Sequence, residues 1–235
     1  AECYLETNQK ASALNAFKSA SAMNFNSQIK EDAFLNYAKL SYEIGNPFED
    51  PPKVLVDFLE AYPKNEQQEL IKELLINSYT KSGNYTAALE ILENKNGYKN
   101  NGNLKRVLIL SAIQQYQSGF FSKASTLFKR GLKIKENKSL EAYALYWFAR
   151  SEYERNLFDD ALDLFKQFRK HPKKNEINAA YRLNYDIGYV YFKLGEYEYA
   201  LKSFKAFNES NSKLDISLQR DTFLRMGDCQ FALKK

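Results

Sequence analysis

Residues 191–207 read YFKLGEYEYALKSFKAF, and the spacing within this stretch decides the fold of the chain. It holds six aromatic residues, two alanines and one glycine in seventeen positions. Gly195 is followed two residues later by Tyr197, five residues later by Ala200 and nine residues later by Phe204. A spacing of this kind indicates a repeat architecture if it recurs elsewhere in the chain.

The spacing does recur. It is found again at Gly83, Tyr85, Ala88, Leu92; at Gly119, Phe121, Ala124, Phe128; at Asn156, Phe158, Ala161, Phe165; and in part at Asn8, Ala13, Phe17. Seven residues before each Gly or Asn lies a column that we call the small column: Ala1, Ala38, Ile76, Ala112, Ala149, Gly188 and Gly227. Successive members are 36 to 39 residues apart, so the period is nearly constant.

The repeated residues predict a helical hairpin. The Gly or Asn is expected to take a left-handed conformation that ends one helix, and a second helix starts two residues later. The alanine in the second helix and the small column in the first allow the two helices to approach closely. The aromatic residue four positions after that alanine lies on the same helical face and is expected to pack toward the next hairpin.

A small residue, an aromatic, Gly, an aromatic, Ala and an aromatic at this spacing resemble the tetratricopeptide repeat over essentially the whole chain. The resemblance implies an all-α, right-handed superhelical solenoid of helix-turn-helix hairpins, about six repeats with truncated ends, as a single domain over 1–235. The expected repeats are approximately 1–30, 31–65, 66–103, 104–137, 138–175, 176–213 and a partial 214–235. Long periods are similar to those of bacterial envelope proteins, which points to a periplasmic or envelope location and leaves the cytoplasm open.

Two parts of the chain depart from the regular repeat. In repeat two, Asp50 and Pro51 predict an N-cap and a first helical position, so this second helix should start late and be short. Ala1 falls within a first helix and Lys234 takes the last Gly or Asn register, so we expect a fragment of a longer repeat protein. Cys3 and Cys229 share one register in the first and last hairpins and are expected to be unpaired.

Composition favours a non-catalytic, all-α protein. Hydrophobic residues make up 44% of the 235 positions, while glycine (9) and proline (5) are scarce. The net charge of +5 comes mostly from lysines spread among acidic residues, which is typical of a solvated surface and gives no support for nucleic acid. No apolar run is long enough to span a membrane. With one histidine and two distant cysteines, we predict no catalytic residues, no metal site and no cofactor.

A stripe of side chains on the first helices is the predicted partner site. Residues six and three before the small column, and one and four after it, project together from a helix. In repeats five and six the stripe combines tyrosine and arginine: Tyr143, Tyr146, Arg150, Tyr153, Arg182, Tyr185, Tyr189 and Phe192. These residue types are enriched where truncation costs most binding energy. A groove would leave Tyr146, Arg150, Tyr185 and Tyr189 exposed, whereas tyrosines that only pack the helices would be buried.

The sequence therefore predicts a protein-interaction scaffold that binds a peptide segment or partner protein in the concave groove. The alternative is a purely structural solenoid module within a larger assembly. An RNA-binding helical repeat would need a basic groove, and this one is mostly aromatic. An α-helical enzyme would need converging titratable groups, and none is visible in the sequence.

Overall fold

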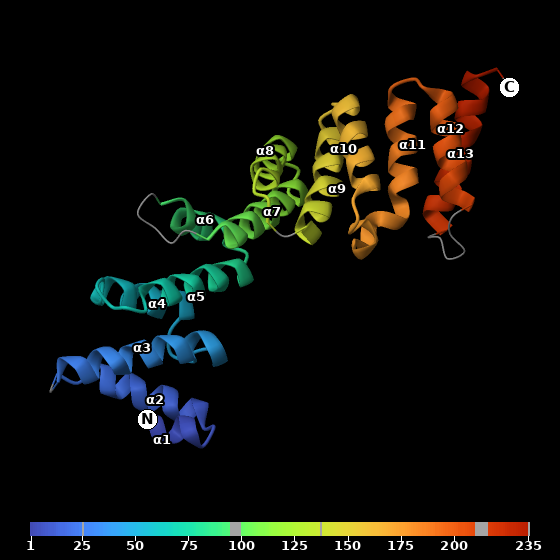
Figure 1. The fold of residues 1–235 in the computed structure, drawn as a ribbon. Helices are drawn as coiled ribbons and strands as arrows, with labels where there is room; N and C mark the ends of the chain where they lie inside the picture. The colour runs from blue at the N-terminus through green and yellow to red at the C-terminus, as the bar shows by residue number, and fades with distance from the viewer. Residues whose placement is uncertain (25, 95–99, 137, 210–215, 235) are drawn as a thin grey trace. The chain divides into compact units, whose positions relative to one another are not determined.

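The computed structural model describes residues 1–24, 26–94, 100–136, 138–209 and 216–234, and these residues form helices and connecting turns. The chain divides into two compact units, residues 1–100 and 101–235. The helices of each unit are labelled in Figure 1, and consecutive helices pack on one another. The all-α class and the repeating hairpins predicted from the sequence are confirmed.

Unit 1 contains three hairpins, each made of a first and a second helix. Its helices are α1 (Glu2–Glu6) with α2 (Lys10–Ser21), α3 (Ser27–Ile44) with α4 (Pro51–Ala61), and α5 (Gln68–Lys81) with α6 (Tyr85–Glu93). The core between them contains Phe17 of α2, Phe58 of α4 and Ile71 of α5, all buried. Helices α2, α4 and α5 each bury apolar side chains against their neighbours.

Unit 2 contains three further hairpins and one more first helix. Its helices are α7 (Asn101–Gln117) with α8 (Phe121–Leu132), α9 (Lys138–Glu154) with α10 (Phe158–Lys170), α11 (Leu183–Lys193) with α12 (Tyr197–Glu209), and α13 (Ile216–Ala232). Two short 3-10 helices, η1 (Lys174–Glu176) and η2 (Asn178–Arg182), lead from α10 into α11. Figure 1 shows α9 to α13 as successive helices of this unit.

The backbone confirms the predicted hairpin turns. Every position in the Gly or Asn register has a positive φ: Asn8, Gly45, Gly83, Gly119, Asn156, Gly195 and Lys234. In five of these turns the amide after this residue donates to a carbonyl five positions earlier, as from Glu196 to Tyr191 at 2.9 Å. Such a bond satisfies a carbonyl that the end of the helix would otherwise leave free.

Close packing within the hairpins also agrees with the prediction. The repeated alanines of the second helices are fully buried: Ala13, Ala88, Ala124, Ala161 and Ala200. A Cβ built on Gly188 would lie 2.6 Å from the ring of Phe204, so the two helices meet where the glycine has no side chain. Ring contacts of Phe204 are with Tyr185 and Tyr189 of its own hairpin, while Phe128 contacts Phe148 of the next hairpin.

Repeat two departs from the others much as expected. Helix α4 begins at Pro51 with Asp50 as the N-cap residue, six positions after Gly45, whereas α6 begins two positions after Gly83. The late start is confirmed, although α4 has 11 residues and α6 is shorter with 9. Gly45 itself has an extended ψ of 169°. Cys3 and Cys229 are both free, as predicted.

Candidate functional site

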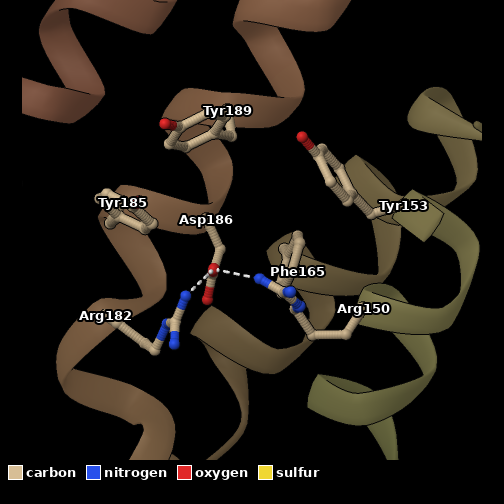
Figure 2. Close-up of a pocket in the computed structure, with 7 residues that line it drawn as sticks. All are labelled: Arg150, Tyr153, Phe165, Arg182, Tyr185, Asp186 and Tyr189. Carbon is tan, nitrogen blue, oxygen red and sulfur yellow. Dashed lines mark hydrogen bonds and ion pairs between the residues drawn. The ribbon is translucent and has the colours of Figure 1, made fainter. Parts of the chain in front are cut away.

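A pocket of about 190 Å³ opens on unit 2 between the hairpins α9–α10 and α11–α12. Seven residues line it, and Figure 2 shows them: Arg150, Tyr153, Phe165, Arg182, Tyr185, Asp186 and Tyr189. Five of these belong to the stripe predicted from the register, and the other two are Phe165 and Asp186. Helix α9, the 3-10 helix η2 and helix α11 therefore bring the predicted arginines and three of the predicted tyrosines to one place.

The carboxylate of Asp186 lies at the centre of the polar contacts. Asp186 is 2% exposed, and its Oδ2 accepts a hydrogen bond of 2.6 Å from the hydroxyl of Tyr146. Its Oδ1 accepts from Nη1 of Arg150 at 2.8 Å and lies 3.3 Å from Nη2 of Arg182. Figure 2 shows the two guanidinium groups reaching this carboxylate from different helices. Asp186 therefore joins the first helix of one hairpin to the first helix of the next.

Arg150 is held at all of its side-chain nitrogens. Besides the bond to Asp186, its Nη2 donates to Glu154 at 3.1 Å and its Nε donates to the hydroxyl of Tyr116 at 3.3 Å. Burial on its own would lower the pKa of Arg150, but the negative charge of Asp186 and the contacts with Tyr116 and Tyr146 together outweigh it, so the pKa is raised. The side chain is thus a fixed, charged part of the junction between hairpins.

Arg182 is less engaged. Its one ion pair among the described residues is with Asp186, and its Nε has no hydrogen-bond partner among them. The guanidinium carbon lies 5.4 Å from the ring centroid of Tyr185, close enough for a cation–π contact. The side chain is 29% exposed. Since a guanidinium has five N–H donors, Arg182 keeps donors for a further acceptor.

Aromatic rings form the apolar part of the pocket. The centroids of Tyr185 and Tyr189 are 5.0 Å apart, and buried Phe165 comes from α10. Both tyrosine hydroxyls donate to Oδ2 of Asp221 on α13, at 2.9 Å from Tyr185. Burial, followed by this hydrogen bond, raises the pKa of Tyr185 to about 12 and also raises that of Tyr189. Because their hydroxyls are bound to α13, these residues present ring surface to the pocket.

Three predicted stripe residues lie outside the pocket. Tyr143 packs edge-on against Trp147 at 6.3 Å, and Phe192 packs against Tyr197 at 5.6 Å. Tyr146 is 2% exposed, so the expectation that it would be exposed is wrong. The rings of Phe165 and Phe168 cover it at 5.8 and 5.4 Å.

The other three residues expected to be exposed are half-buried: Arg150, Tyr185 and Tyr189. Each is used by the neighbouring hairpin, either through Asp186 or through Asp221. The position in the repeat predicts the helix face on which a residue lies, but packing of the next hairpin determines how much of that face is exposed.

Asp186 was missed by the sequence analysis, although the sequence holds a signal for it. It lies four residues after Arg182, a spacing at which opposite charges meet on one face of a helix. A carboxylate in the apolar segment YDIGYV also needs a partner if that helix is packed on both sides. Phe165 was predicted only as a packing residue, and it both packs and lines the pocket.

The pocket combines charged and aromatic side chains. It presents one partly free guanidinium, aromatic rings and a carboxylate whose two oxygens are already bonded. Within the described ranges, no group of three His, Cys, Asp or Glu side chains is placed to hold a metal ion. No helix in the described part of the chain is both long and apolar enough to cross a membrane.

Comparison with known proteins agrees with this architecture. Residues 143–173 match the family model of the tetratricopeptide repeat, and residues 74–94 match the model of the PPR repeat. The first match covers most of α9 and all of α10, which contribute three of the residues that line the pocket. No curated protein matches the chain.

Among solved structures, the chain is similar to BtubC from P. vanneervenii, with 14% identity, a TM-score of 0.53, and coverage of 93% of this chain and 85% of that one. A tetratricopeptide repeat protein from Parabacteroides merdae aligns at 16% identity over 99% of this chain and 84% of that one, with a TM-score of 0.46. The similarity to BtubC concerns the fold alone.

The matched repeat at 143–173 and the shared register of the hairpins define the class. The chain is a helical repeat protein, and its hairpin at residues 143–173 matches the tetratricopeptide repeat. Repeats of this type generally mediate protein–protein interactions, and proteins built from them are typically non-catalytic scaffolds.

Proposed function

We propose that this chain is a protein-interaction module and that the pocket between α9, α10 and α11 receives a segment of a partner protein. The observation that carries the proposal is the pocket itself, in which Arg182, Tyr153 and the rings of Tyr185 and Tyr189 converge. Arginine and tyrosine are the side chains most often found at the energetic centre of protein interfaces. A concave site lined by aromatic rings with few polar groups is typical of a binding site.

The eight stripe residues divide into three roles under this proposal. Tyr153, Arg182, Tyr185 and Tyr189 contact the partner, and Arg150 supports them through Asp186. Tyr146, Tyr143 and Phe192 hold the helices in place, because their rings pack against neighbouring aromatic side chains.

A purely structural module is the second candidate, and the Asp186 contacts favour it. The hydrogen bonds among Tyr146, Arg150 and Asp186 join two hairpins. A module that only holds its neighbours at a fixed spacing would need such a junction and no binding site. Under this alternative the pocket is a gap in the packing and has no peptide ligand. The two candidates differ in whether any peptide binds there.

Selection from a displayed library of random peptides tests the proposal, followed by fluorescence anisotropy of the selected peptides. Arg182→Ala combined with Tyr153→Ala should weaken binding at least tenfold, since each truncation removes a contact in the pocket. These two positions are preferable to Arg150 and Tyr185, whose side chains also bond the neighbouring helix.

A matched control carries the same two substitutions outside the pocket. Arg220 on α13 and Tyr199 on α12 are exposed, so Arg220→Ala with Tyr199→Ala should leave binding unchanged. Circular dichroism confirms that both double variants stay helical. Failure to select any peptide, or equal binding by the two double variants, would reject the pocket as the partner site.

A further inference from the structure

We infer that the pocket recognises an aromatic side chain with a carboxylate beside it, as at an acidic residue next to phenylalanine or tyrosine, or at a C-terminal aromatic residue. The inference rests on the proposed function and names the chemistry of the anchor. It follows from the size of the pocket, from the unused donors of Arg182 and from the occupied oxygens of two aspartates.

The pocket has the size and lining for one aromatic ring. Its volume is about 190 Å³. An apolar cavity of about 150 Å³ in another protein is large enough to bind benzene. Phe165, Tyr185 and Tyr189 offer ring surfaces, and a fourth ring in offset or edge-on contact with them is the preferred aromatic geometry. Figure 2 shows Phe165 between Tyr153 and Tyr185 in the view into the pocket.

The polar end of the pocket favours an anion. Of the charged side chains that line it, two are arginines and one is an aspartate. Glu154, which pairs with Nη2 of Arg150, does not line the pocket. Arg182 therefore stands as the guanidinium with donors to spare, and a planar carboxylate can accept from two of its N–H groups at once.

A cationic or neutral polar anchor fits less well. Asp186 already accepts from Tyr146 and Arg150 and pairs with Arg182. Asp221 likewise accepts from both tyrosine hydroxyls. Because both carboxylates already accept hydrogen bonds, neither is free to pair with a lysine or arginine of the partner.

Small model compounds test the inference without knowledge of the partner. N-acetyl-L-phenylalanine carries the ring and the carboxylate, N-acetyl-L-phenylalaninamide carries the ring alone, and N-acetylglycine carries the carboxylate alone. The whole 235-residue chain, labelled at its tyrosine rings and arginine side chains, is titrated with each compound by NMR. We expect the acid to shift the signals of Arg182 and of the pocket tyrosines and to bind about tenfold or more tightly than either of the other compounds.

Arg182→Gln should reduce the preference for the acid over the amide to about twofold while binding of the amide is retained. The matched control Arg220→Gln should keep the preference, because Arg220 lies on α13 away from the pocket lining. Equal binding of acid and amide, an unchanged preference in Arg182→Gln, or no binding of any compound would overturn the inference. A selected peptide that binds in the pocket without an aromatic and acidic pair would also overturn it, yet would leave the proposed function standing.

Discussion

Replacement of Asp186 by asparagine should destabilise the junction between the hairpins α9–α10 and α11–α12. The substitution keeps the shape of the side chain but removes the negative charge that faces Arg150 and Arg182. It also turns one of the two carboxylate oxygens into an NH₂ group, which cannot accept the hydrogen bond that Tyr146 or Arg150 donates there. The two guanidinium groups would then face one another across a neutral side chain.

The size of the effect follows from what remains. Removing one partner of a buried ion pair costs about 3 to 5 kcal/mol when the other charge is left alone. Arg150 still has Glu154 at 3.1 Å, and Arg182 is partly exposed to water, so both keep some compensation. We therefore expect the free energy of unfolding of this junction to fall by about 2 to 3 kcal/mol.

Tryptophan fluorescence during urea denaturation measures this change directly. Trp147 is the only tryptophan of the chain, and its ring centroid lies 5.5 Å from that of Tyr146. The signal therefore reports on the junction itself. With a slope of about 2 kcal/mol per molar urea, the midpoint should fall by roughly 1 M or somewhat more.

Asp163→Asn is the matched control, because Asp163 is exposed on α10 and does not line the pocket. A second variant, Tyr146→Phe, removes only the hydroxyl that donates to Asp186. The double variant should be less destabilised than the sum of the two single changes, because both remove the same hydrogen bond. If Asp186→Asn matches Asp163→Asn, or if the two changes add fully, the account of this junction is refuted.

Three further outcomes are expected. Gly188→Ala should lower the free energy of unfolding by about 1 to 3 kcal/mol, since its Cβ would lie 2.6 Å from the ring of Phe204. Gly227→Ala in the same register should be neutral or slightly stabilising, because nothing lies within 4 Å of the added Cβ. Equal shifts of the two variants in thermal melts would contradict this. Gly119→Val should cost about 1 to 3 kcal/mol, because a φ of 79° is unfavourable for a β-branched residue, and an unchanged melting midpoint would argue against the hairpin turn. Folding should weaken as pH rises from about 10 to about 12, because the unfolded chain loses the proton of Tyr185 near pH 10 and the folded chain only near its raised pKa of about 12. Ultraviolet titration should show this late ionisation in the wild type and its absence in Tyr185→Phe, and identical titration curves would exclude it.

The turns of this fold could be predicted from the sequence because each depends on a local rule. One residue per repeat must adopt a positive φ, and Gly or Asn fills that position in six of seven cases. Lys234 was located by the period alone, and its φ is 55°. Repeat two shows the limit of such a rule, since α4 begins six positions after Gly45, whereas α6 begins two positions after Gly83.

The site was predictable only in part, because the position of a residue in the repeat gives the helix face on which it lies but not how deeply its side chain is buried. The period places Tyr146 and Arg150 on one face, but the size of Phe165 and Phe168 decides that Tyr146 is covered. The pairing of Arg150 with Asp186 joins residues 36 positions apart, so it depends on how consecutive hairpins stack. No local pattern in the sequence carries that information.

The carboxylates at successive junctions have a consequence for modular engineering of this protein. Hairpin α9–α10 supplies Tyr146 and Arg150 to Asp186 of the following hairpin, and α11 supplies Tyr185 and Tyr189 to Asp221 of α13. Each of these two hairpins thus donates hydrogen bonds that a carboxylate of the next helix along the chain accepts. These hairpins are therefore not interchangeable. A chimera that reorders or deletes one would leave polar groups without hydrogen-bond partners at the new junction. Grafts should transfer neighbouring hairpins together.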